Sequence, residues 1–108
     1  MRSLDEAREV CDRYHPGMCS ALADISLSER EAAGGPVLGV FRKFGGPGLL
    51  VPPEYGGAGA DALSAVRVIR AMSSYSPSLG AASTMHNFTV AMLFALATLR
   101  EISTASND

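Results

Sequence analysis

The sequence has little charge and few of the residues that usually carry chemistry. Charged side chains make up 19% of its 108 residues, tryptophan is missing, and there are two cysteines and two histidines. A net charge of −2 without a cluster of Lys and Arg argues against nucleic-acid binding, which requires several neutralised phosphates. Two cysteines are too few for a secreted disulfide scaffold, and the N-terminus lacks the apolar core of a signal peptide. We therefore expect a cytoplasmic protein.

Charge is also missing from a long internal stretch, between Arg70 and Arg100. The segment from Leu79 to Leu99 is long enough to span a bilayer. Its first half nevertheless contains Gly80, Ser83, Thr84, His86, Asn87 and Thr89. Polar groups at that depth are costly in lipid, so we expect a helix buried inside protein and no membrane partner.

Apolar residues make up 47% of the chain, enough for one hydrophobic core, and their spacing is helical. The pattern predicts an all-α fold, a bundle of four or five helices in one domain spanning 1–108. A first helix begins at about Ser3 and breaks at His15-Pro16-Gly17, where proline and glycine interrupt the periodicity. Further helical segments are expected over 18–25, in a single turn at 28–31, and over 36–44, 60–74 and 77–100.

The last two helices carry specific expectations. In the helix over 60–74, we expect Leu63, Val66, Ile69 and Met72 to face inward and Asp61 to lie in the first turn, near the positive end of the helix dipole. Ser76-Pro77 is a typical pairing of a capping residue with a proline at the first helical position. The helix that follows is apolar nearly all round, which predicts a central position.

The stretch LLVPPEYGGAGAD, Leu49 to Asp61, poses the main functional question. Read from Gly57, it satisfies the relaxed G-x-G-x-x-A form of the dinucleotide-binding turn. However, Pro52-Pro53 removes two backbone donors from the required strand, and no acid lies between Asp61 and Glu101 to hold a ribose. We therefore interpret the loop as a tight turn between helices, in which the structural residues are Glu54, Tyr55, Gly56, Gly57 and Gly59.

Two groups of polar residues remain. Cys11, His15 and Cys19 recur at every fourth position, as zinc ligands could, but Pro16 spoils the helix and a fourth ligand is missing. Small buried thiols explain this group better, and we expect no metal site. His86-Asn87 lies within the apolar last helix, where it is either a core pair satisfied by nearby backbone or the polar lining of a pocket.

Two quoted segments resemble a known family. GLLVPPEYGGAGAD (48–61) and SPSLGAASTMHN (76–87) are similar to the N-terminal helical domain of the acyl-CoA dehydrogenases, whose members typically show V-P-E-E-Y-G-G-x-G and then a helix with small residues before H-N. The likeness runs from about Ser3 to Leu99 and is strongest over 48–87. Pro53 stands where the family often has Glu.

The resemblance implies a flavoenzyme in which FAD is held mainly by a middle β-domain and a C-terminal helical bundle, both absent from this chain. It implies α,β-oxidation of an acyl thioester carried by CoA or by a carrier protein. The catalytic base lies in that bundle, so no catalytic residue is expected here. The substrate-binding positions carried over are Ala81, Ala82, Met85 and Thr89, with His86 and Asn87 close by.

The expected partners are accordingly the acyl thioester, the remaining enzyme domains or a second copy of the chain. Alone, the chain is expected to be inactive. The alternative interpretation is a non-catalytic helical module that serves interaction or dimerisation and is derived from the same fold.

Overall fold

The computed structural model describes residues 2–107, with side chains for 3–105. No strand occurs among the described residues, which confirms the all-α fold class. The described residues form six α-helices, against the four or five expected. The shortest is the single turn that the sequence predicted at 28–31. In chain order the elements are α1 (Arg2–Tyr14), α2 (Met18–Ala23), α3 (Leu27–Arg30), α4 (Val37–Lys43), the 3-10 turns η1 (Gly46–Gly48) and η2 (Pro53–Tyr55), α5 (Ala62–Tyr75) and α6 (Pro77–Asn107).

Glycines end the first and fourth helices at the predicted places. Gly17 adopts a left-handed φ of 89° between α1 and α2, and Gly45 a φ of 81° after α4. Side chains with a Cβ rarely adopt these angles, so the chain turns where glycine stands. The turn at Gly17 folds α2 back so that it contacts α1, α4 and α5, and Met18 and Leu22 are fully buried.

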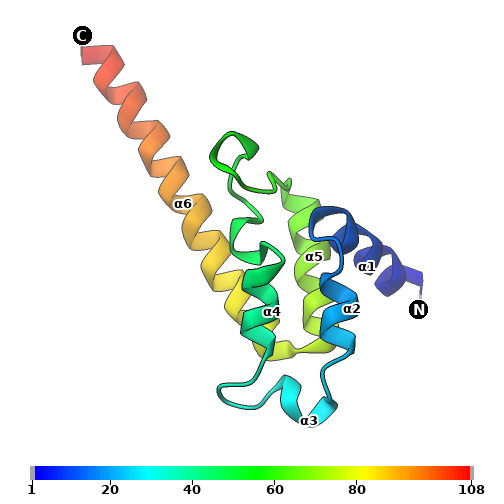
Figure 1. The fold of residues 1–108 in the computed structure, drawn as a ribbon. Helices are drawn as coiled ribbons and strands as arrows, with labels where there is room; N and C mark the ends of the chain where they lie inside the picture. Colours follow the sequence, from blue (N-terminus) through cyan, green and yellow to red (C-terminus); the bar gives the residue numbers. More distant parts are fainter. Residues whose placement is uncertain (1, 108) are drawn as a thin grey trace.

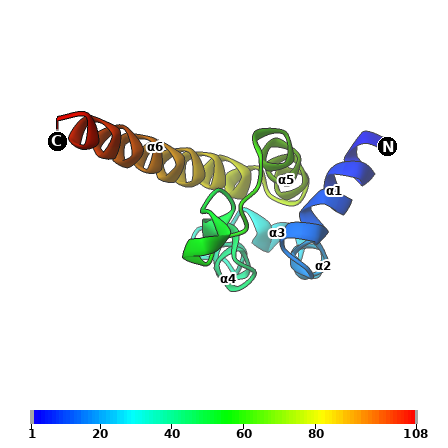
Figure 2. The same cartoon turned by 90° about the horizontal axis from the view of Figure 1, so that it is seen from above.

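The core lies mainly between α1 and α5, which lie side by side (Figures 1 and 2). On α1 the buried residues are Ala7, Val10 and Cys11. On α5 the buried face is Ala65, Val68, Ala71 and Met72. The expectation that Leu63 and Val66 face inward is wrong, because they are 62% and 55% exposed. The exposed and the buried face of α5 are both apolar. Helix α1 packs against the buried face, where the small side chains of Ala65 and Ala71 permit a close approach of two helices.

The last helix differs most from the expectation. It continues past Arg100 to Asn107, and its outer half extends away from the rest of the molecule (Figure 1). Its buried residues are Leu79, Gly80, Ser83 and Asn87, and no described residue after Asn87 is buried. The prediction of a central helix is therefore wrong for this chain. The described part of the chain has no further element to cover the apolar surface of α6.

Candidate functional site

The buried face of α6 fixes this helix on the rest of the molecule. Asn87 is fully buried, and its Nδ2 donates to the Ser83 backbone carbonyl and hydroxyl, both at 3.0 Å, and to the Gly46 carbonyl at 3.4 Å. A Cβ at Gly46 would overlap the Phe41 ring, so only glycine allows η1 to approach so closely. Asn87 therefore joins α6 to the corner after α4, but its buried Oδ1 has no hydrogen-bond partner among the described residues.

His86 lies beside this contact but remains exposed. Its Nε2 is 3.0 Å from the Pro47 carbonyl oxygen. A carbonyl oxygen only accepts, so the ring donates through Nε2. His86 is therefore held at the surface of α6 by this hydrogen bond to the corner after α4.

The other substrate-binding positions of the sequence prediction lie on the outward side of α6. Ala81, Ala82, Met85 and Thr89 are all exposed, and Met85 retains 75% of its surface. The Thr89 hydroxyl donates to the Met85 carbonyl at 2.7 Å, within the helix. The structure thus brings these four residues together on one surface and turns Asn87 away from them.

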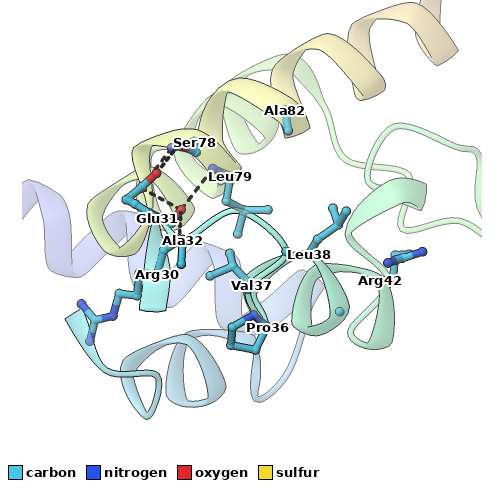
Figure 3. A pocket seen from close by; sticks show the side chains of 14 residues that line it. Arg30, Glu31, Ala32, Pro36, Val37, Leu38, Arg42, Ser78, Leu79 and Ala82 are labelled. Atoms are coloured by element: carbon cyan, nitrogen blue, oxygen red, sulfur yellow. Dashed lines mark hydrogen bonds between the residues drawn. The ribbon is translucent and has the colours of Figure 1, made fainter. Parts of the chain in front are cut away.

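Ala82 also lines a cavity of about 460 Å³ between α6, α4 and the loop that precedes α4 (Figure 3). Apolar walls come from Val37, Leu38 and Leu79, and the Arg42 guanidinium lies at its edge. Its volume is within the range of small-molecule sites. Sequence reasoning missed this cavity, because its walls come from segments about 40 residues apart.

Glu31 closes one end of the cavity and binds the start of α6. One carboxylate oxygen accepts from the Ser76 hydroxyl at 2.9 Å and from the Ser78 amide at 3.2 Å, and the other accepts from the Ser78 hydroxyl. The Ser78 hydrogen bonds lower the pKa of Glu31 below its usual value. Ser76 caps α6 as predicted, since its hydroxyl accepts from the Leu79 amide at 3.2 Å.

The glycine loop has a different use from phosphate binding. Its successive amides, from Gly56 to Ala60, donate to carbonyls of residues 48–53 at 2.9 to 3.2 Å. A dinucleotide loop needs such amides free to face a pyrophosphate. Because these amides are already used and no strand precedes them in the described chain, the loop cannot act as a phosphate cradle in this conformation.

The five predicted turn residues all lie in this loop. Glu54 and Tyr55 belong to η2, and Gly56 and Gly59 have φ angles of 85° and 64°. A Cβ at Gly57 would overlap the Val51 backbone. Tyr55 places its ring 5.6 Å from that of Phe94 on α6, whereas Glu54 is exposed to solvent.

The residues Cys11, His15 and Cys19 are all buried around the break between α1 and α2. The two thiols are free and hydrogen-bond each other, which raises the pKa of Cys11 and lowers that of Cys19. Among the described residues, no group of three or more His, Cys, Asp or Glu side chains is placed to hold a metal ion. The interpretation of Cys11 and Cys19 as small buried thiols is confirmed.

One property of α6 allows two explanations. By length and composition, the segment Pro77–Ala105 could cross a membrane, and none of its most apolar stretch is buried in this structure. Such a property is weak support for a span, since a helix that packs against other protein domains has the same composition.

Comparison with curated proteins finds an isobutylamine N-hydroxylase from Streptomyces viridifaciens, 67% identical over 96 residues. The match covers 89% of this chain and 25% of the hydroxylase, so the chain spans about a quarter of that relative's length. No solved structure matches the chain. The family described as acyl-CoA dehydrogenase, N-terminal domain, matches residues 5–101, which extend from α1 into the outer half of α6. The chain therefore belongs to the acyl-CoA dehydrogenase family, of which it represents the N-terminal helical domain.

Proposed function

We propose that this chain supplies one wall of the substrate pocket of a larger flavin-dependent oxidoreductase. The observation that carries the proposal is the two-sided arrangement of α6. Ser83 and Asn87 fix one side of the helix to its own domain, while Ala81, Ala82 and Met85 lie exposed on the surface. Other domains of the enzyme would close over this surface and complete the pocket.

The chemistry of the wall suits an apolar substrate group. Ala81 and Ala82 leave room beside the helix, and Met85 has a flexible, polarisable side chain that adapts to irregular shapes. Thr89 and His86 add the polar groups of the wall, although the Thr89 hydroxyl is engaged with the helix backbone. Asn87 positions the helix and does not reach the substrate.

Among reactions of the family, we favour N-hydroxylation of a small aliphatic amine. Its support is the 67% identity to a protein named isobutylamine N-hydroxylase, which extends over 89% of this chain. In that overall reaction an amine, O₂, two electrons and two protons give a hydroxylamine and water. The alkyl group of such an amine would lie against the apolar wall.

The second candidate is α,β-oxidation of an acyl thioester carried by CoA or by a carrier protein. Its support is the family match itself, which extends over residues 5–101. We assign no catalytic residue of this chain to either reaction. The third possibility, a non-catalytic interaction or dimerisation module, requires the chain to act without further domains.

Family membership implies the use of flavin, and we propose FAD. The described residues do not fit the role of its main binding site, because the amides of the glycine loop donate internally. FAD would therefore be held by the other domains. Proteins of this family are typically soluble, and we propose a cytoplasmic location.

The test is an assay of the native polypeptide that carries this domain, after its mass has been measured in the source cells. We expect a polypeptide much longer than 108 residues that, with flavin, a reductant and O₂, converts isobutylamine into a product one oxygen atom heavier. Turnover of an acyl-CoA with an electron acceptor, without amine oxidation, would instead establish the second candidate. A native product of 108 residues would contradict both enzymatic functions.

A matched pair of variants tests the wall in that native polypeptide. Ala82→Leu places a larger side chain on the proposed wall and should lower kcat/KM at least tenfold, since small changes of volume in a pocket cost about 10- to 200-fold. Ala23→Leu makes the same change on an exposed surface of α2 and should leave kcat/KM unchanged. Equal effects of the two substitutions would remove Ala82 from the wall.

A further inference from the structure

We propose that Cys11 and Cys19 form a reversible redox site, at which a peroxide oxidises the two thiols to a disulfide within the chain. This inference does not depend on the proposed function, which uses neither thiol. The two residues are the only cysteines of the 108-residue sequence, and both are free thiols. Cys11 lies on α1 and Cys19 on α2, on the two sides of the break at residues 15–17.

The fold holds the two thiols next to each other. The left-handed turn at Gly17 folds α2 back against the end of α1 (Figures 1 and 2). The side chains of Cys11 and Cys19 meet between the two helices and share a hydrogen bond. A disulfide requires the two Cβ atoms to lie about 3.8 Å apart and the two Sγ atoms about 2.05 Å apart. Because the thiols are already neighbours, the bond needs a small approach of the two sulfur atoms and no rearrangement of the fold.

The surroundings of the pair favour Cys19 as the thiol that reacts first. The hydrogen bond from Cys11 lowers the pKa of Cys19 below its usual value, and the positive charge of Arg8 lowers this pKa as well, whereas burial and the charge of Asp12 oppose both effects. The same hydrogen bond, together with burial, raises the pKa of Cys11, so this thiol keeps its proton. Cys19 is 7% exposed and Cys11 is 0% exposed. A thiol that combines some access with a nearby cation is typical of reactive cysteines.

Contacts of Arg8 with α5 support this assignment independently. The guanidinium carbon of Arg8 lies 4.5 Å from the centre of the Tyr75 ring, and its Nη2 donates to the Ser74 hydroxyl at 3.1 Å. These contacts fix the positive charge near the thiol pair. The Nε of Arg8 is buried and has no hydrogen-bond partner among the described residues. A buried donor without an acceptor is costly, so a negative charge on Cys19 would offset a cost that the reduced, neutral pair leaves in place.

The reaction balances with one molecule of peroxide. The Cys19 thiolate attacks one oxygen of hydrogen peroxide, the O–O bond breaks, and hydroxide leaves and takes up the proton that Cys19 released. Cys19 is now a sulfenic acid, oxidised by two electrons. The Cys11 sulfur then attacks the Cys19 sulfur, and the hydroxyl group leaves with the Cys11 proton as a second water. Two thiols and one hydrogen peroxide thus give one disulfide and two waters, and a dithiol reductant reverses the change.

Peptide mapping tests the disulfide in the native polypeptide that carries this domain. Trypsin cleaves after Arg8, Arg13 and Arg30, so it places the two cysteines in separate peptides, 9–13 and 14–30. The folded protein is treated with hydrogen peroxide, the peroxide is removed with catalase, and the remaining thiols are alkylated in urea before digestion. We expect a joined species with the summed mass of both peptides less two hydrogen atoms. Dithiothreitol before alkylation should replace it by the two alkylated peptides.

Three outcomes would overturn the redox site. The first is that no joined peptide forms at any peroxide concentration that preserves the circular dichroism of the folded protein. The second is that the joined peptide forms only when the peroxide is added in urea, because the fold then does not bring the thiols together. The third is that either cysteine is joined to a cysteine elsewhere in the polypeptide.

Two pairs of variants test the order of oxidation. In Cys11→Ala the sulfenic acid of Cys19 has no thiol to react with, so dimedone should label peptide 14–30 after peroxide treatment. In Cys19→Ala the labelling of peptide 9–13 should be slower, because Cys11 keeps its proton. Arg8→Gln should slow disulfide formation about threefold for each unit by which the pKa of Cys19 rises, since the loss of thiolate outweighs the gain in nucleophilicity. Arg70→Gln removes the same charge from an exposed position on α5 and should leave the rate unchanged. Equal labelling of the two alanine variants, or equal rates of the two glutamine variants, would overturn the assignment of Cys19 as the thiol that reacts first.

Discussion

At the scale of single residues, His15 is the side chain whose burial has a direct consequence for pH dependence. It is 2% exposed at the break between α1 and α2, and its Nε2 has no hydrogen-bond partner within the described chain. Burial lowers the pKa of His15 below its usual value of 6.5, and a backbone hydrogen bond at Phe44 opposes this effect only in part. The folded protein therefore favours the neutral ring.

This burial predicts a loss of stability in mild acid. Above pH 6.5 the ring is neutral in both states, so His15 adds no pH dependence. Below pH 6.5 the unfolded chain takes up a proton that the folded chain resists, so the free energy of unfolding decreases until the pH falls below the folded pKa. Urea unfolding at intervals from pH 7.5 to 5.5 should show this decrease. This range lies above the usual pKa values of the carboxylates.

Two glutamine variants separate His15 from other causes. His15→Gln should flatten the decrease between pH 7.5 and 5.5, because the titrating group has gone. His86→Gln, at an exposed position, should retain it. A wild-type stability that does not change over this range would contradict the burial of a neutral His15.

At the scale of elements, the crossing of α5 and α6 depends on one glycine. A Cβ at Gly80 would overlap the Ser73 hydroxyl and Cβ, because the two helices approach closely at this point. The Ser73 hydroxyl also donates to the Ile69 carbonyl at 2.8 Å, which restricts its rotation. Close contact at this crossing fixes the direction in which α6, and therefore the proposed pocket wall, leaves the domain.

Two Gly→Ala substitutions within helices test this crossing. Gly80→Ala should destabilise the protein by about 1 to 3 kcal/mol, as expected when a methyl group is forced into a packed contact. Gly39→Ala in α4 meets no atom within 4 Å and should stabilise by about 0.5 to 1 kcal/mol, because alanine favours a helix over glycine. Chemical unfolding followed by circular dichroism measures both values. Similar effects at the two positions would mean that the helices do not approach closely at Gly80.

At the scale of the whole molecule, the described chain is elongated, with principal extents of 57, 31 and 19 Å. The longest dimension follows α6, whose outer half extends away from the rest of the described chain (Figure 1). In this part of the helix, Phe94 contacts Tyr55 of the glycine loop. A helix of this length with so much exposed apolar surface is expected to be covered by other protein. The enzyme domains of the proposed function would cover it.

The separation of this domain from the proposed cofactor site predicts that the 108-residue chain alone binds no FAD tightly. After incubation with FAD and gel filtration, the protein fraction should show no flavin absorbance in the visible range. The reason is that the glycine-loop amides are already used as donors. Flavin that comigrates with the chain in a 1:1 ratio would contradict this prediction.

The sequence alone located the turns, the helices and the family. Gly17, Gly45 and Ser76 act within one or two turns of their own position, so their effects are readable from neighbouring residues. Likewise, the motif over 48–61 indicated the family before any contact was known. Buried thiols at Cys11 and Cys19 also followed from composition and from the break at Pro16.

Only the tertiary structure decided which apolar faces are covered. On α5 two apolar stripes compete, and the one with Ala65 and Val68 is buried because α1 packs there, while Leu63 stays exposed. Glu31 binds the start of α6 across 45 residues, a contact that no local pattern encodes. The long last helix has the composition of a buried element but lies exposed, because burial depends on the surface that other segments bring to it.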